Sequence, residues 1–134
     1  INSCQDHFKR VLTIIEGKFY WTLNIDLLIL QMNGNPIDIC SWAVYTALQS
    51  TFLPSVEIYK GESGQYEDFE VNSDITHSNV LFSYPSPVPI TITLSKISED
   101  TSFLVDVTSD ESSCVISSLT IAISNDQKCH LIRK

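Results

Sequence analysis

Two pairs of neighbouring carboxylates are the residues best suited to general acid–base chemistry or to Mg²⁺ binding. They are Glu99–Asp100 and Asp110–Glu111, and paired acids at the end of a strand can serve both kinds of chemistry. Both pairs lie in short polar segments typical of turns, where acidic side chains favour solvent and local capping. We interpret them first as turn residues, with Asp110–Glu111 as the stronger catalytic candidate.

Serine, histidine and cysteine offer little further chemistry. Ser63 lies between glycines in an acidic loop, but the loop lacks the G-x-S-x-G pattern and the strand-to-helix turn of a nucleophile elbow. Cys129 and His130 are adjacent and point to opposite faces of any strand. The histidines have no zinc-ligand spacing: His7, His77 and His130. We predict no serine nucleophile, no metal site and no cofactor.

The turn Asn33-Gly34-Asn35-Pro36 is a candidate anion site, because a helix is predicted directly after it. The first turn of a helix presents free amides to phosphate. No Lys or Arg stands beside this turn, and Asp38 would repel phosphate. We interpret it as a structural turn, since glycine and asparagine tolerate positive φ and proline suits the first helical turn.

The clearest of the elements that must position these residues is a strand over Tyr20–Leu30. Its apolar residues alternate and then occupy both faces, which predicts a central strand covered on each side. Before it, the pattern predicts the end of a helix over residues 2–9, a short strand over Val11–Ile15 and a turn at residues 16–18.

The remaining pattern predicts one helix and then a run of strands. The helix begins after Pro36 and stops before Pro54. A strand over Val56–Lys60 and a solvated acidic loop over Gly61–Asp68 follow. An antiparallel meander comes last, with strands over Ile90–Ile97, Phe103–Thr108, Ile116–Ser124 and Lys128–Ile132. This order indicates an α+β fold, with a mixed sheet packed with helices, rather than a doubly wound parallel sheet.

Composition limits the classes of function. A chain of 134 residues with 43% hydrophobic residues fits one globular domain. A net charge of -8 makes it a poor stand-alone binder of nucleic acid. The apolar run Leu27–Leu30 is too short to span a bilayer, so we expect no membrane partner. The four scattered cysteines are expected to be small buried hydrophobes.

The order of the elements resembles the core of RNase PH-like domains, from about Val11 to the end of the chain. The matching pieces are Leu28–Leu30, Gly34–Asn35, Ile37–Asp38, Ala43–Leu48, Leu53–Pro54, Pro89–Leu94, Phe103–Thr108 with Asp110–Glu111, and Leu119–Ile123. The resemblance implies a three-layer α+β fold of the ribosomal-protein-S5 domain 2-like type. It also implies that residues 1–134 are a single RNase PH-like domain, a fragment without the family's N-terminal half and C-terminal helix.

The resemblance also indicates which residues stand at the family's catalytic positions. Active members degrade RNA from the 3′ end by phosphorolysis, holding phosphate with a Gly-Ser/Thr-Arg turn and using two later aspartates. The residues after the turn glycine are here Asn35 and Pro36, so a proline stands in place of the arginine. The aspartate positions fall close to Ser112 and Ser118.

Two further features bear on whether these positions are degenerate. A shift of the alignment by a residue or two brings Asp110 or Glu111 nearer to an aspartate position, and we keep both as fallback candidates. No such shift supplies the arginine. The non-catalytic branch of the family in the exosome ring keeps Gly-Asn and a following Asp, as Gly34, Asn35 and Asp38 do here.

The resemblance therefore implies a non-catalytic structural subunit of the exosome ring, acting in 3′-to-5′ RNA processing and degradation in nucleus and cytoplasm. Its partners would be other RNase PH-like ring subunits, with RNA reached through the assembled ring. One alternative is an active phosphorolytic exoribonuclease, which predicts a basic side chain pointing at the Gly34 turn. A second is an unrelated small α+β binding domain, which predicts a monomer without an exposed apolar edge.

Overall fold

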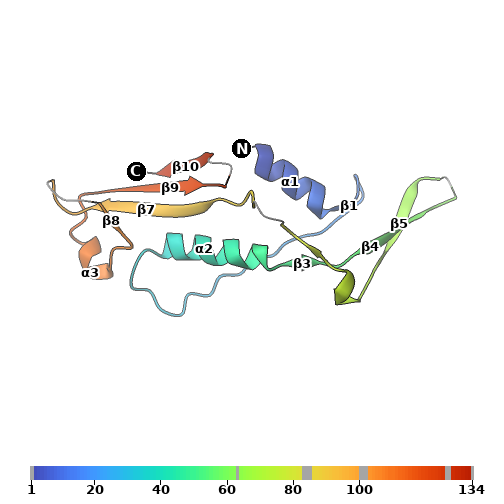
Figure 1. The fold of residues 1–134 in the computed structure, drawn as a ribbon, viewed down its shortest axis with the longest axis horizontal. Helices are drawn as coiled ribbons and strands as arrows, with labels where there is room; N and C mark the ends of the chain where they lie inside the picture. The colour runs from blue at the N-terminus through green and yellow to red at the C-terminus, as the bar shows by residue number, and fades with distance from the viewer. Residues whose placement is uncertain (1, 63, 83–85, 100–102, 126–127, 134) are drawn as a thin grey trace. The chain divides into compact units, whose positions relative to one another are not determined.

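The computed structural model describes residues 2–62, 64–82, 86–99, 103–125 and 128–133 (Figure 1). The chain forms two compact units. The first unit consists of residues 1–24 and 48–84, and the second unit of residues 25–47 and 85–134. Each unit is therefore assembled from two stretches that are far apart in the sequence.

The first unit is built from one long helix and short antiparallel strand pairs. Its elements are α1 (Asn2–Leu12), β1 (Thr13–Ile15), β2 (Phe19–Tyr20), β3 (Phe52–Leu53), β4 (Val56–Lys60), β5 (Tyr66–Val71), the 3-10 helix η1 (Ile75–His77) and β6 (Asn79–Val80). The pairs are β1 with β2, β3 with β6, and β4 with β5. Phe82 is 2% exposed, and the Phe8 ring meets it edge-on at 4.8 Å between centroids.

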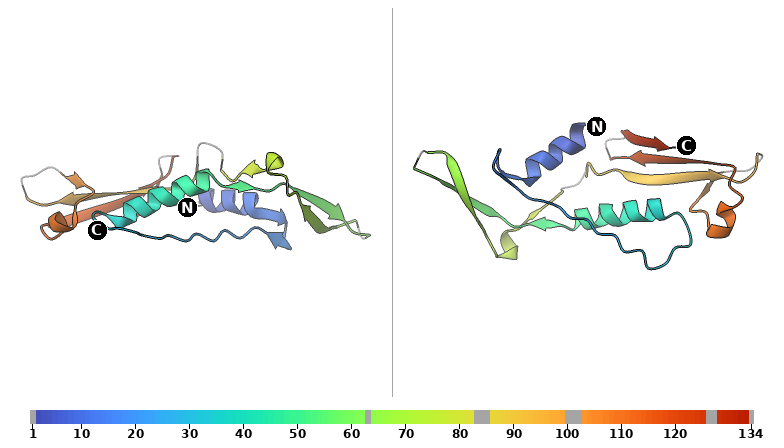
Figure 2. Two further views of the ribbon diagram at one scale, coloured as in Figure 1. Left: turned by 90° about the horizontal axis from the view of Figure 1, so that it is seen from below. Right: turned by 180° about the vertical axis from the view of Figure 1, so that it is seen from behind.

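The second unit holds a four-stranded antiparallel sheet in the order β10-β9-β7-β8 (Figure 2). Its elements are α2 (Pro36–Gln49, whose last two residues belong to the first unit), β7 (Ile90–Lys96), β8 (Leu104–Val105), α3 (Ser109–Ser112), β9 (Ser117–Ile123) and β10 (Cys129–Arg133). The longest pairing joins β7 to β9, from Ile90 opposite Ile123 to Lys96 opposite Ser117.

The two faces of the β7–β9 pair differ in chemistry, because successive side chains of a strand point to opposite faces. On one side, which we call the hydroxyl face, Thr93 pairs with Thr120 and Ser95 with Ser118. On the other, the apolar face, the register pairs Ile90 with Ile123, Ile92 with Ile121 and Leu94 with Leu119.

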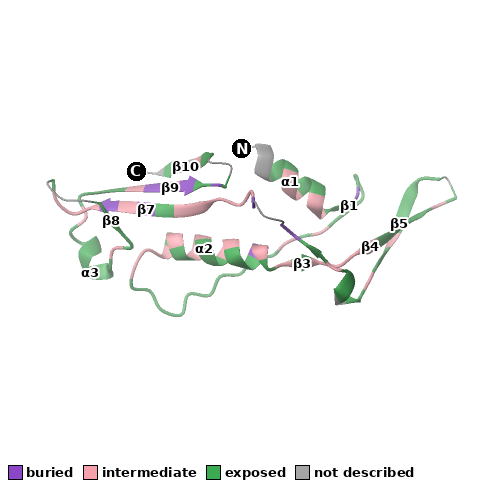
Figure 3. Cartoon of the chain, viewed as in Figure 1, coloured by how far each residue is buried: buried purple, intermediate pink, exposed green. Residues whose placement is uncertain are grey.

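Burial on this sheet is the reverse of the usual arrangement. The hydroxyl face contains the buried positions, with Ser95 3% and Thr93 8% exposed, whereas on the apolar face Ile92 is 37% and Ile123 42% exposed (Figure 3). Exposed apolar surface of this extent marks a site of contact with other molecules more often than a free surface.

The strand predicted over Tyr20–Leu30 is wrong beyond Tyr20. The structure has only β2, Phe19–Tyr20, and residues 21–30 form no strand. Leu28 is 83% and Leu30 88% exposed, so neither face is covered (Figure 3). The alternation has the period of a strand, but a strand needs a hydrogen-bonded neighbour. No described part of this chain provides one along residues 21–30.

Other expectations are confirmed or corrected at the level of single elements. Helices form at α1 and α2, and antiparallel strands form at β7, β8, β9 and β10. The expected meander is wrong in its order, because β9 pairs directly with β7 and β8 lies at the edge of the sheet. The strand over Phe103–Thr108 shrinks to β8, because Asp106 adopts a positive φ of 55° that ends it. The loop predicted over Gly61–Asp68 contains the start of β5, which pairs with β4.

Two expectations from composition concern the cysteines and the membrane. Cys114 and Cys129 are exposed and Cys40 is half-buried, so the prediction that they are buried hydrophobes is wrong for these residues. Cys114 follows the short helix α3, and Cys129 lies on the edge strand β10, which explains their exposure. Among the described residues, no helix is both long enough and apolar enough to cross a bilayer.

Candidate functional site at the start of helix α2

The positions that the resemblance marks as catalytic surround one cavity of about 710 Å³ in the second unit. We call it the α2 cavity. The turn before α2, the hydroxyl face of the sheet and the segment around α3 form its walls. All four degenerate family positions line it: Asn35, Pro36, Ser112 and Ser118. Residues that are more than 80 positions apart in the sequence are thus brought to one place.

The turn before α2 is held by the side chain of Asp106. Its Oδ1 accepts a hydrogen bond from the backbone amide of Asn35 at 3.1 Å. A Cβ added at Gly34 would lie 2.6 Å from the same oxygen, so only glycine fits here without moving Asp106. The group that approaches the turn is therefore a carboxylate, the opposite of the cation that a phosphate site requires.

Some of the first backbone amides of α2 already donate hydrogen bonds to side chains of this chain. Pro36 has no N–H, and the side-chain oxygen of Asn35 accepts from the amide of Ile37 at 3.1 Å. The Asn35 amide nitrogen donates to Oδ2 of Asp38 at 3.2 Å. This local network satisfies donors that an anion would otherwise use.

Asp38 fastens the start of α2 to strand β7. Its Oδ2 accepts from the backbone amide of Thr93 at 2.7 Å, and its Oδ1 accepts from the Thr93 hydroxyl at 3.1 Å. The Thr93 and Thr120 hydroxyl oxygens are 2.9 Å apart within the buried part of the hydroxyl face. Asp38 therefore has a positioning role in this structure.

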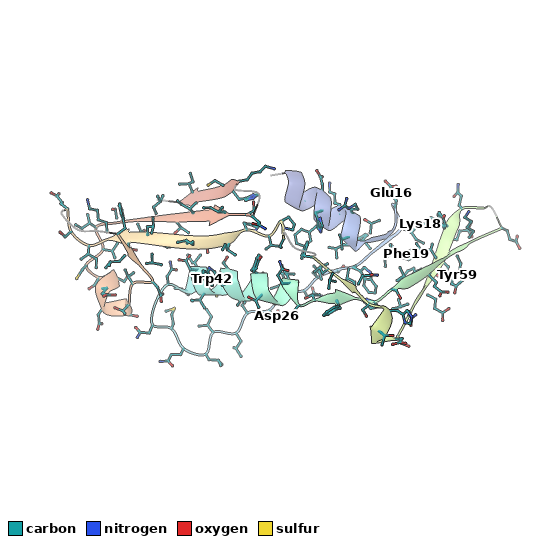
Figure 4. All side chains as sticks on the ribbon, in the orientation of Figure 1. Glu16, Lys18, Phe19, Asp26, Trp42 and Tyr59 are labelled. Carbon is teal, nitrogen blue, oxygen red and sulfur yellow. The ribbon has the colours of Figure 1, made fainter. Side chains whose placement is uncertain are left out.

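One turn further along α2, Ser41 and Trp42 continue the attachment. Ser41 Oγ accepts from the amide of Thr91 at 3.0 Å. Trp42 lies on α2 (Figure 4), and its Nε1 donates to the Thr91 carbonyl oxygen at 3.3 Å. Asp38 and Ser41 thus accept from alternate amides of β7, and Trp42 donates to one of its carbonyl oxygens. Helix α2 therefore covers backbone groups that a neighbouring strand would otherwise bind.

The fallback candidates Asp110 and Glu111 lie in α3 and do not line the α2 cavity. The Glu111 carboxylate accepts from the Thr108 amide at 2.8 Å and from its hydroxyl at 2.9 Å. These bonds lower the pKa of Glu111, the backbone bond contributing most. Thr108 in turn accepts from the Glu111 amide at 3.3 Å, which completes a capping box. Glu111 is thus engaged in capping, and Asp110 is exposed.

The lining of the α2 cavity has no charge. Within the part of the chain that the structure describes, it contains no Lys, Arg or His and no carboxylate. The charged groups fixed to the adjoining turn are Asp38 and Asp106, and both are acidic. Two negative charges beside the turn repel a phosphate.

The other residues considered from the sequence do not form a site. His77 Nδ1 is 3.5 Å from Asp74 on an exposed surface, and His130 Nε2 is 2.6 Å from Ser124 Oγ. The described residues contain no cluster of three or more possible metal ligands. Glu99 is exposed. Ser63 and Asp100 lie outside the described residues.

Sequence reasoning missed Asp106 and the hydroxyl residues of the sheet. The signal for the second group was present, because Thr91, Thr93 and Ser95 alternate with apolar residues in β7. Asp106 lay within a predicted strand, and nothing local indicated its positive φ.

The chain matches no family model, but curated proteins align with most of it. A Dictyostelium discoideum protein named RRP42, whose name includes the words exosome complex exonuclease, is 37% identical over 115 residues, which cover 84% of this chain and 33% of that protein. Exosome complex component Rrp42 of Sulfurisphaera tokodaii is 36% identical over 102 residues, covering 76% of this chain and 33% of its own length. The same component of Saccharolobus islandicus is 28% identical over 92% of this chain and 41% of its own length. The chain thus spans 33% to 41% of the length of these relatives.

Proposed function

We propose, from the premise that this chain is a homologue of the Rrp42 exosome components over most of its length, that it is a non-catalytic structural subunit of the exosome ring. It acts in 3′-to-5′ RNA processing and degradation, in nucleus and cytoplasm. Its partners are other RNase PH-like ring subunits, and RNA is reached through the assembled ring. Residues 1–134 form part of one RNase PH-like domain.

The observation that carries the non-catalytic proposal is the uncharged lining of the α2 cavity. Phosphorolysis transfers a highly charged group, so it depends on cations and on precisely held carboxylates. Proline and asparagine occupy the phosphate turn, and serines occupy the aspartate positions. Removal of one preorganised partner typically costs ~10²-fold in rate, so the absence of the whole set leaves no measurable turnover.

An active exoribonuclease is the alternative that the name of the Dictyostelium relative favours. That alternative predicted a basic side chain at the Gly34 turn. Among the described residues, the side chain that approaches the turn is Asp106, with its carboxylate oxygen 2.6 Å from the position of a Gly34 Cβ. This geometry supports the structural proposal over the enzymatic one.

Exposed apolar residues support a role within an assembly. In the segment Ile25–Met32, six apolar side chains are more than half exposed: Ile25, Leu27, Leu28, Ile29, Leu30 and Met32. The apolar face of the sheet adds Ile92 and Ile123. An independent binding domain was expected to lack such surfaces, whereas a subunit needs them for its neighbours.

The net charge of -8 supports the indirect route to RNA. The proposal is tested by purifying the protein from its native cell under mild conditions, followed by mass spectrometry of what accompanies it. We expect other RNase PH-like ring subunits in near-equal amounts. Recovery of the protein without them would overturn the assembly role.

A further inference from the structure

Two reactive groups lie next to each other in the turn before α2, the Asn33 side chain and the backbone nitrogen of Gly34. The hydrogen bonds of this turn are made by Asn35, through its amide to Asp106 and through its side chain to the first turn of α2. Among the described residues, neither the Asn33 side chain nor the Gly34 amide has a hydrogen-bonding partner. Asn33 is also exposed. Both groups are therefore available to react with each other.

The reaction open to such a pair is deamidation, which makes asparagine one of the thermolabile residues. The Gly34 nitrogen attacks Cγ of Asn33, and the new N–Cγ bond closes a succinimide ring. The bond from Cγ to Nδ2 breaks, so that Nδ2 leaves as ammonia with the proton that the Gly34 amide has lost. Water then opens the ring at either of its two carbonyl carbons. The products are aspartate and isoaspartate, in which the main chain runs through the former side chain.

The residue that follows an asparagine decides whether this attack takes place. Glycine permits it best, because it has no Cβ and adopts a wide range of backbone angles, and Asn33 is the one asparagine of the sequence that a glycine follows. Asn24 is also exposed, but it precedes Ile25, whose branched Cβ hinders the approach. Asn35 precedes Pro36, which has no N–H to lose. The sequence and the exposure together select Asn33.

The products fit this turn less well than asparagine does. Each adds a carboxylate at residue 33, beside a turn whose charged neighbours Asp38 and Asp106 are already acidic. Isoaspartate also lengthens the main chain directly before Gly34, where a single added Cβ would lie 2.6 Å from Asp106 Oδ1. Both changes oppose the hydrogen bond from the Asn35 amide to Asp106.

We propose that Asn33 is a site of spontaneous deamidation in the folded protein, and that its conversion to aspartate and isoaspartate adds a negative charge and loosens the start of α2. The reaction needs no co-reactant except water. Because ammonia is lost, each molecule undergoes the change once. This inference goes beyond the proposed function and does not rest on it, since the chemistry depends on the turn alone.

The test is to incubate the folded full chain in mildly alkaline buffer, which favours loss of the Gly34 amide proton. Peptide mass spectrometry follows the mass change of deamidation, and chromatography separates the aspartate and isoaspartate peptides. We expect progressive loss of the asparagine form at residue 33 with both products, and no measurable loss at Asn24. Asn33 that stays unchanged in the folded chain would overturn the proposal, as would conversion of Asn24 at the same rate. A parallel incubation in urea shows whether the fold prevents the attack.

Variants of the two exposed asparagines assign the reaction and its consequence. Asn33→Gln keeps an amide but places it further from the Gly34 nitrogen, so the mass change should disappear, whereas Asn24→Gln, the matched control, should leave it unaltered. Asn33→Asp adds the charge without lengthening the main chain. In two-dimensional NMR spectra, the Asn35 amide resonance should shift in Asn33→Asp and shift further in the isoaspartate form. An Asn35 resonance that is the same before and after conversion would contradict the loosening of α2.

Discussion

The two faces of the second unit's sheet have opposite chemistry and opposite surroundings. The hydroxyl face is buried and is fixed by directional hydrogen bonds, as in the contact between Asp38 and Thr93. The apolar face is half-buried except at Ile92 and Ile123, which are exposed, and most of the segment Ile25–Met32 is exposed as well. Helix α2 is therefore held against the sheet largely by polar contacts. The exposed apolar side chains are the surface that we propose for contact with ring neighbours.

The largest expected effect comes from placing charges on the exposed apolar segment. Changing Leu28 and Leu30 together to Lys places two charges on side chains that are 83% and 88% exposed. Recovery with other ring subunits should be lost, because an interface does not tolerate unpaired buried charges. The free energy of unfolding of the isolated chain should change by less than ~0.5 kcal/mol.

The control for that pair is Asn24→Lys, which adds one such charge at an exposed polar position directly before the segment Ile25–Met32. Co-purification and quantitative mass spectrometry compare the two. If the Leu28 and Leu30 variant assembles as well as the control, the segment is not a contact surface.

The next largest effect comes from removing the hydrogen bonds between Asp38 and the hydroxyl face. Asp38→Ala removes the acceptor for the Thr93 amide and hydroxyl and should lower the free energy of unfolding by ~1.5–3 kcal/mol. Urea unfolding provides the measurement. Asp110→Ala is the control, because this carboxylate is exposed and away from the cavity lining. A loss in Asp38→Ala no greater than in the control would show that α2 is held by other contacts.

A smaller effect concerns the turn. Gly34→Ala places a Cβ against the Asp106 carboxylate and should weaken its bond to the Asn35 amide, at a cost of ~1 kcal/mol in unfolding free energy. Combining it with Asp106→Ala should cost less than the sum of the two single changes, because both act on one contact. Strict additivity in a double-mutant cycle would argue against that contact.

The smallest effect is local and depends on pH. The Thr108 hydrogen bonds lower the pKa of Glu111, so its contribution to capping is present at neutral pH and is lost as pH falls through the lowered pKa, which lies below 4.5. The Thr108 amide resonance should report that titration, and Glu111→Gln should abolish it. A midpoint at or above 4.5 would mean that the capping box does not form.

Local patterns predicted most of the sheet and both long helices, because turn residues and periodicity specify them. They predicted the cavity's wall residues Asn35, Pro36, Ser112 and Ser118 only through the resemblance, since nothing local brings these positions together. The sequence could not show whether Tyr20–Leu30 forms a strand. A strand needs a hydrogen-bonded neighbour, and the alternation of apolar residues along the segment does not reveal whether one is present. The inverted sheet was missed for the same kind of reason: a period of two identifies two faces but does not say which one is covered.

The central claim, that this protein contributes structure without catalysis, is tested most directly by incubating the purified full-length protein with a 3′-labelled RNA and inorganic phosphate. We expect no phosphate-dependent release of nucleoside diphosphates above the background of a buffer control. Release that requires phosphate, and that disappears in Asp110→Asn or Glu111→Gln, would contradict it.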